Sequence, residues 1–147
     1  MTSCDTNILL YAFNASCPEH ARAYTYLRDQ QQNESFAICE LVLLELYVLL
    51  RNPAVVASPL SAKEAVRVVQ QFRDNPRWRV IDYPGGLMPA IWRLAAQSHF
   101  PRQGILDARL AATLRHHGVR EFATRNTAHF RNFGFDRLIN PIDPSPR

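Results

Sequence analysis

Short runs of β-forming residues alternate with longer stretches of helical periodicity along this chain. The pattern predicts strands at 3–4, 35–39, 77–81, 121–124 and 137–139, and helices at 18–32, from 41 to a stop at Asn52-Pro53, and at 61–73, 87–97, 104–117 and 128–133. Strands that alternate with helices favour right-handed crossovers and a mainly parallel sheet covered on both faces. We therefore predict an α/β fold, in which functional groups follow the carboxyl ends of strands.

Length and composition indicate one soluble globular domain. The chain has 147 residues, 47% of them hydrophobic and 20% charged, which suits a single compact core. Its apolar runs at 8–13 and 41–50 are too short to span a membrane, and no basic leader precedes a cleavable apolar region. The expected location is the cytoplasm, with no membrane partner.

Charge and cysteine content narrow the classes of partner and site. The net charge is +4, and Lys63 is the only lysine, so arginine carries nearly all the positive charge. This arginine-rich positive charge makes nucleic acid a candidate partner, although a basic surface without such a partner explains the charge equally well. Cys4, Cys17 and Cys39 are odd in number and lack a metal-ligand spacing, which argues against a disulfide framework and a zinc site.

Three acids stand out, each with an ordinary alternative explanation. Asp5 follows the first strand, where a helix N-cap is the favoured role for a lone acid. Glu45 interrupts an otherwise apolar helix that we expect to be buried all round, so it needs an arginine partner, a protonated state, an aqueous cleft or a metal ion. Asp107 lies in the first turn of a helix, where the helix dipole favours an acid.

Taken together, the three acids point to a metal site. A central first strand would bring Asp5, Glu45 and Asp107 to one rim of the sheet, where their mutual repulsion requires a counter-charge. Arginine could supply it, and an oxygen-only cluster also suits Mg²⁺ or Mn²⁺. A metal held by carboxylates is common machinery for phosphodiester hydrolysis, so a basic protein with this site fits a nuclease.

Four stretches then resemble a known family in order and spacing. SCDTNILLYAF, LVLLELYVLLRNP, ILDARLAATLRHHGVREFATRN and RLINP are similar to the PIN-domain ribonucleases of the VapC toxin group. The resemblance implies a PIN-like three-layer α/β/α sandwich at residues 1–141, followed by an irregular tail at 142–147. It also implies a Mg²⁺- or Mn²⁺-dependent endoribonuclease that inhibits translation as the toxin of a type II toxin-antitoxin pair.

The same resemblance assigns partners and site residues. It implies an RNA substrate (tRNA, rRNA or mRNA), a VapB-type antitoxin and a homodimer. Asp5, Glu45 and Asp107 match the family's catalytic, metal-binding acids. Polar positions around them, and two arginines expected to hold RNA phosphates, complete the predicted site: Asn7, Thr124, Asn126, Arg109 and Arg125.

One departure from the family pattern bears on the mechanism. Where many relatives carry a fourth acid two residues after the threonine, this chain has Asn126, and His129 replaces the aspartate before Phe130. An asparagine supplies no charge, so a second metal would be held weakly. Two alternatives stay open: another phosphate chemistry on an α/β sheet, such as a haloacid-dehalogenase-like phosphatase or a receiver domain, and an RNA- or antitoxin-binding module with little catalysis.

Overall fold

The computed structural model describes residues 1–143 of the chain. Most of the predicted tail at 142–147 therefore lies outside the described residues. Residues 142 and 143 belong to no helix or strand, and Ile142 packs into the core with its carbonyl accepting a 2.8 Å hydrogen bond from Arg22.

Five strands and seven helices alternate along the described part of the chain. The sequence predicts all five strands and the six helices after α1. The strands are β1 (Thr2–Cys4), β2 (Phe36–Cys39), β3 (Arg79–Ile81), β4 (Glu121–Ala123) and β5 (Arg137–Ile139). The helices are α1 (Thr6–Phe13), α2 (His20–Gln30), α3 (Glu40–Leu50), α4 (Ala62–Arg73), α5 (Met88–Ala95), α6 (Gly104–His116) and α7 (Thr127–Phe130).

All strand pairings are parallel, and the strand order is β3-β2-β1-β4-β5. The chain builds the sheet outward from β1 in one direction through β3, and then returns to add β4 and β5 on the other side. The order thus reverses between β1 and β4. In open parallel sheets this switch point leaves a crevice beyond the carboxyl ends of the two strands, where ligands bind.

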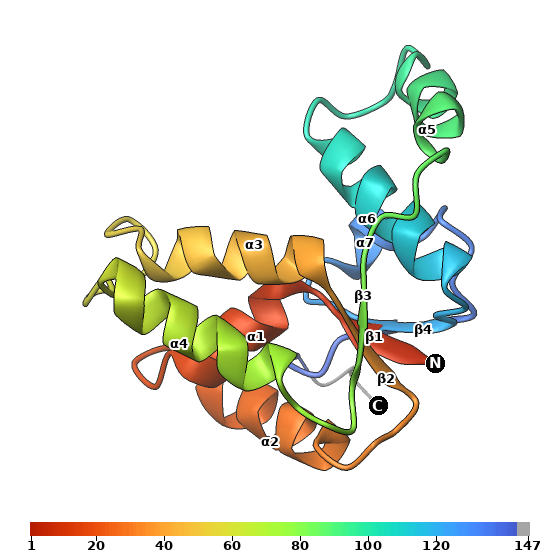
Figure 1. Cartoon of the computed structure of the whole chain (residues 1–147). Helices are drawn as coiled ribbons and strands as arrows, with labels where there is room; N and C mark the ends of the chain where they lie inside the picture. Colours follow the sequence, from red (N-terminus) through yellow and green to blue (C-terminus); the bar gives the residue numbers. More distant parts are fainter. Residues whose placement is uncertain (144–147) are drawn as a thin grey trace.

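Helices cover the sheet in two groups. Figure 1 shows α1 to α4 together on one side and α6 and α7 on the other, with α5 projecting beyond the far end of α6. The core between them is continuous, and β2 is buried along its whole length. These three layers confirm the predicted α/β/α architecture. None of the helices in the described part combines the length and apolar character needed to cross a membrane.

Local signals explain several helix boundaries. Ser61 and Glu64 form a capping box at the start of α4, through hydrogen bonds of 2.8 and 3.2 Å. The predicted start of α2 at Pro18 is two residues early, because turns occupy the segment before His20. The helix predicted at 128–133 is shorter, since α7 ends at Phe130 and a turn follows.

The prediction that α3 is buried all round is wrong. Val42, Leu43 and Leu46 pack into the core, whereas Leu44 and Val48 are 65% and 62% exposed. Apolar residues on every side of a helix indicate burial only if a neighbour covers each side, and no element of the described chain covers this one. Glu45 lies between the covered and uncovered sides.

Candidate active site

The three predicted acids lie near the rim where the strand order reverses. Asp5 directly follows β1, and Thr124 directly follows the neighbouring β4. Because α6 precedes β4 and runs back along the sheet, its first turn brings Asp107 to the same rim. Glu45 reaches the site from the second turn of α3, which begins where β2 ends. The fold therefore collects acids that are separated by up to 102 positions in the sequence.

Asp5 acts as a helix cap and also faces the switch point. Its Oδ1 accepts a 2.8 Å hydrogen bond from the backbone N–H of Thr6 at the start of α1. Its Oδ2 accepts bonds from the hydroxyl of Thr124 (2.6 Å) and the side-chain amide of Asn7 (3.0 Å). The bond from Thr124 crosses between β1 and β4. The cap role and the site role are thus both compatible with this one side chain.

Glu45 is held by a residue that the sequence reading did not assign to the site. The Thr6 hydroxyl donates a 2.6 Å hydrogen bond to Oε2 of Glu45, while the Thr6 backbone N–H bonds Asp5. Thr6 is buried and so links two of the acids from within the core. In the sequence, its position between Asp5 and Asn7 was the feature that could have indicated this role. No lysine or arginine of residues 1–143 forms an ion pair with Glu45, so the core salt bridge considered above is absent there.

Asp107 is held more loosely, by His129 from α7. The distance from Nδ1 of His129 to Oδ2 of Asp107 is 3.3 Å, and the two side chains are 61% and 31% exposed. His129 is a second residue that the sequence reading left without a role. The signal for it was its position before Phe130, where the resembled family carries an acid.

The three carboxyl groups influence one another electrostatically. Burial is the main cause that raises the pKa of Asp5, of Glu45 and of Asp107. The charge of Asp107 further raises the pKa of Asp5. The charge of Asp5 raises the pKa of Glu45, and the charge of Glu45 raises the pKa of Asp107. Hydrogen bonds from Thr124 and the other donors offset only part of this effect. The charge of His129 lowers the pKa of Asp107 but does not cancel the effect of burial. No arginine or lysine of residues 1–143 forms an ion pair with any of the three acids, so the site concentrates negative charge.

This donor set fits a hydrated cation better than a protein cage. Among residues 1–143, no group of three or more His, Cys, Asp or Glu side chains is arranged closely enough to hold one metal ion. The fold thus brings the predicted acids to one rim without forming a three-ligand cluster. Mg²⁺ keeps several waters and uses only one or two carboxylates, and carboxylate oxygens that have no arginine or lysine partner among residues 1–143 suit it.

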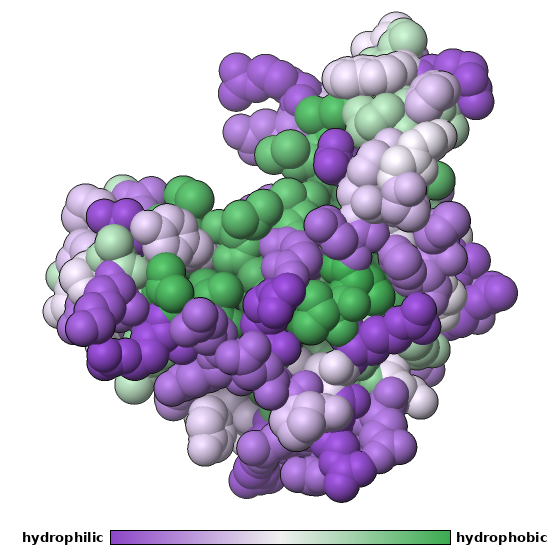
Figure 2. Space-filling view, in the orientation of Figure 1, coloured by the Kyte–Doolittle hydropathy of each residue, from purple (hydrophilic) through white to green (hydrophobic). Residues whose placement is uncertain are grey.

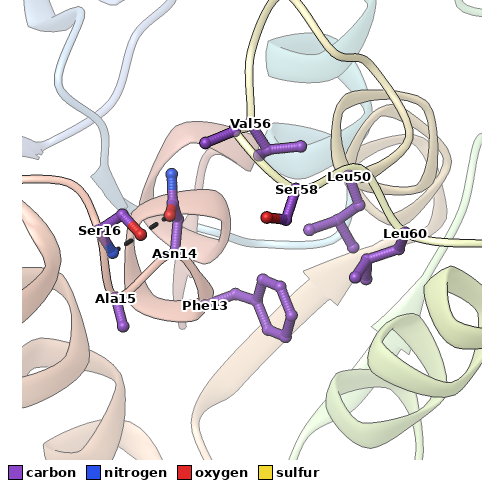
Figure 3. Close-up of a pocket in the computed structure, with 9 residues that line it drawn as sticks. Phe13, Asn14, Ala15, Ser16, Leu50, Val56, Ser58 and Leu60 are labelled. Carbon is purple, nitrogen blue, oxygen red and sulfur yellow. Dashed lines mark hydrogen bonds between the residues drawn. The ribbon is translucent and has the colours of Figure 1, made fainter.

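A large pocket opens beside two of the acids. Its volume is about 1020 Å³, and Glu45, Asp107 and Asn126 contribute to its wall. Asp5 is not among the residues that line this pocket. A smaller pocket of about 250 Å³ sits at the far end of α1, between Asn14 and Leu60 (Figure 3). None of the described residues that line the smaller pocket is titratable, so this pocket offers no group for general acid-base or metal chemistry.

The predicted polar positions surround the acids. The side-chain amide of Asn7 also lies 3.4 Å from the Thr124 hydroxyl, and its Oδ1 accepts a 3.3 Å bond from the backbone of Arg125. The backbone N–H of Asn126 donates to the Thr124 hydroxyl at 3.0 Å. Thr124 therefore connects β1, β4 and the loop that enters α7. This arrangement suits a positioning role for Asn7, Thr124 and Asn126.

Both predicted phosphate-binding arginines have partners within the chain. Arg125 lies 2.8 Å from the Tyr11 hydroxyl and 2.8 Å from Glu19. The guanidinium of Arg109 stacks over the ring of Tyr83, 4.2 Å from its centroid. Their contact with RNA stays a prediction.

Comparison with known proteins identifies the class that this fold and site define. A family model described as the PIN domain matches residues 3–136, and the chain belongs to the PIN-domain family, in its VapC ribonuclease group. Ribonuclease VapC24 of Mycobacterium tuberculosis is 53% identical over 142 residues, which cover 97% of each chain. Ribonuclease VapC48 of the same organism is 27% identical over 140 residues, covering 94% of this chain and 95% of the relative.

Solved structures agree on the fold. Rickettsia felis VapBC2, bound to a DNA fragment of its promoter, superimposes with a TM-score of 0.66 at 20% identity, over 95% of this chain and 97% of the other. Mycobacterium tuberculosis VapC20, a toxin that cleaves the sarcin-ricin loop, gives a TM-score of 0.64 at 17% identity, over 83% and 87%. Because the chain belongs to this family, the phosphatase and receiver-domain alternatives no longer apply.

Proposed function

We propose that this chain is a metal-dependent endoribonuclease, in which Asp5, Glu45 and Asp107 bind Mg²⁺ or Mn²⁺ directly or through water. The observation that carries the proposal is the accumulation of three carboxyl groups of raised pKa at the switch point, with no arginine or lysine of residues 1–143 paired to any of them. The reaction is hydrolysis of an RNA phosphodiester bond. When bound, the ion supplies Lewis-acid charge for the phosphate and for the attacking water.

The protein's own groups position this chemistry. Thr124 and Asn7 fix one oxygen of Asp5, and Thr6 fixes one oxygen of Glu45. These donors hold the carboxylates in place without neutralising them, which keeps their charge available to a cation. Asn126 adds a neutral oxygen at the pocket wall, so the proposal is a mechanism that depends on one tightly held ion.

The proposal extends to the partners of the chain. As a toxin of a type II pair in the cytoplasm, it would cleave tRNA, rRNA or mRNA and so inhibit translation, and it would be held inactive by a VapB-type antitoxin. The similarity to VapBC complexes supports the antitoxin. The uncovered apolar side of α3, with Leu44 and Val48 exposed, supports a homodimer, because a surface stripe of this kind usually meets another chain.

Cleavage of total RNA under Mg²⁺ or Mn²⁺ titration tests the proposal. We expect Asp5→Ala and Asp107→Asn each to lower the cleavage rate by at least about 100-fold, since even residues that only support metal ligands affect activity by about 10–100-fold. Isothermal titration with Mn²⁺ should show weaker binding by both variants. Mapping the cleaved ends would identify the RNA and the bond.

Asp29→Asn is the matched control, because Asp29 is an exposed surface acid whose one ion pair within residues 1–143 is with Arg28. It should cleave RNA and bind Mn²⁺ like the wild type. Full activity in Asp5→Ala or Asp107→Asn would contradict the metal-site proposal. A wild-type protein that binds RNA without cleaving it at any metal concentration would favour the binding-module alternative.

A further inference from the structure

The large pocket has a second wall that the proposed chemistry does not use. The segment between α5 and α6 contributes His99, Phe100 and Arg102 to it, while Glu45 and Asp107 line the same pocket from α3 and α6. Figure 2 shows the molecule hollowed between the body and the projecting arm, with hydrophobic side chains gathered in the hollow. The pocket lining therefore combines acids with an aromatic ring and the guanidinium group of Arg102.

Phe100 has a fixed place in this wall. Ring carbons Cε1 and Cζ of Phe100 lie 3.3 Å from the point that a Cβ on Gly104 would occupy, so the ring packs directly on the backbone there. Hydrogen bonds from Phe100 N to Gln97 O (3.0 Å) and from Gly104 N to Pro101 O (2.9 Å) hold the segment in turns. The missing side chain of Gly104 is what admits the ring to this position.

The ring and Asp107 share one end of α6. Gly104 is the first residue of this helix, and Asp107 follows three positions later, on a neighbouring part of the helix surface. Phe100 is only half-buried and also lines the pocket, so part of its ring is accessible from the site. A flat ligand resting on this ring would extend toward the carboxylates.

We infer that this wall is a nucleotide subsite, in which an RNA base stacks on Phe100 while Arg102 meets a phosphate. The inference rests on the proposed ribonuclease function and deepens it. The occupant is single-stranded RNA, because only unpaired bases offer a free face to an aromatic ring. The pocket volume of about 1020 Å³ lies at the upper end of the usual range for ligand sites, which leaves room for a nucleotide beside a hydrated ion. Arg102 is exposed and free to reach the RNA backbone.

Phe100→Ala and Phe100→Trp test the subsite. Base stacking on an aromatic ring contributes about 1–3 kcal/mol, so Phe100→Ala should weaken binding by about 5–150-fold, and Phe100→Trp should retain the affinity. The probe is a 5′-labelled single-stranded RNA oligonucleotide of mixed sequence, read by fluorescence anisotropy. In cleavage assays of the same oligonucleotide, the loss should appear in KM, with kcat nearly unchanged.

Trp92→Ala is the matched control, since Trp92 is an aromatic residue of the same arm that is 59% exposed and outside the pocket wall. It should bind the oligonucleotide like the wild type. Unchanged affinity in Phe100→Ala would overturn the subsite. So would equal losses in Phe100→Ala and Phe100→Trp, which would indicate a packing role. A changed oligomeric state with unchanged RNA affinity would assign the wall to a protein contact.

The two readouts separate this inference from the proposed function. Anisotropy requires no turnover, so binding that depends on Phe100 in a protein without cleavage would contradict the ribonuclease and leave the subsite standing. Metal-dependent cleavage that is indifferent to Phe100→Ala in both KM and affinity would support the ribonuclease and overturn the subsite.

Discussion

Asp5 and Asp107 carry the same charge at the same rim, yet the protein holds them in opposite ways. Asp5 receives hydrogen bonds from three groups, one of them the buried hydroxyl of Thr124. Among residues 1–143, Asp107 forms one ion pair, with the exposed ring of His129. The first acid is bonded across the junction that forms when β1 and β4 pair. The second is presented on a helix end that faces the open pocket.

This difference separates fixed from adjustable parts of the site. A carboxylate held by short bonds from buried donors loses little conformational freedom when a ligand arrives, because its orientation is set on folding. A carboxylate with one exposed contact can turn toward an ion or a phosphate. We infer that the Asp5 side defines where the site lies, and that the Asp107 side adapts to what binds there.

The strongest way to break the fixed side is Thr124→Val, which keeps the shape of the residue and removes its hydroxyl. Asp5 then loses its 2.6 Å donor and the backbone N–H of Asn126 loses its acceptor. We expect RNA cleavage to fall by about 10–100-fold, and the free energy of unfolding to fall by about 1–3 kcal/mol. Cleavage kinetics and chemical denaturation measure the two effects.

Thr113→Val controls for the loss of a buried hydroxyl. The Thr113 hydroxyl donates a 2.9 Å hydrogen bond to the carbonyl of Arg109 within α6 and has no other partner in the described part of the chain, so the change should leave cleavage unaffected. If Thr124→Val cleaves RNA at the wild-type rate, Asp5 needs no fixed orientation for cleavage. The proposed difference between a fixed Asp5 side and an adjustable Asp107 side would then be wrong.

His129→Ala disturbs the adjustable side and should have a smaller effect. Its contact with Asp107 is exposed and 3.3 Å long, and pairs of this kind contribute about 0–1 kcal/mol. We therefore expect a decrease in cleavage of less than about 10-fold and an unfolding free energy within about 0.5 kcal/mol of the wild type. Stopped-time cleavage assays and thermal melts measure both.

His129→Gln sharpens this test, because its amide can donate to Asp107 where a methyl group cannot. Recovery of activity in His129→Gln would indicate that the hydrogen bond orients Asp107. If His129→Ala loses as much cleavage activity as Thr124→Val, the Asp107 side is as fixed as the Asp5 side, which would contradict the proposed difference between them.

The same contrast explains which parts of the fold and of the site could be predicted from the sequence. The alternation of strands and helices predicted the parallel sheet, and the position of Asp5 after β1 predicted its place at the rim, because both depend on local periodicity and topology. Thr6 and His129 were missed as site residues, since their roles depend on which side chains meet across the fold. The apolar pattern of α3 also predicted its burial wrongly. Whether another element covers Leu44 and Val48 cannot be known from the sequence of the helix itself.

The smallest expected effect concerns pH and the metal-free protein. Burial raises the pKa of Asp107 above its ordinary value of 3.8, so between that value and the raised pKa the folded state binds more protons than the unfolded state. Stability therefore falls as pH rises through this window, and the full loss is present above the raised pKa. Asp107→Asn removes this titration. We expect its melting temperature, with chelator present, to match the wild type near pH 4 and to exceed it at pH 7.

Asp5→Asn should not show this gain, although burial also raises the pKa of Asp5. An asparagine there offers a single acceptor oxygen to the three donors from Thr6, Asn7 and Thr124, and its own amide faces one of them. The lost hydrogen bonds therefore offset the relief of desolvation. Since about 1 kcal/mol shifts the melting temperature by about 2–4 °C in domains of this size, the difference between the two variants is measurable by calorimetry across pH 4 to 7. A gain of equal size in both variants would mean that the donors around Asp5 do not distinguish it from Asp107.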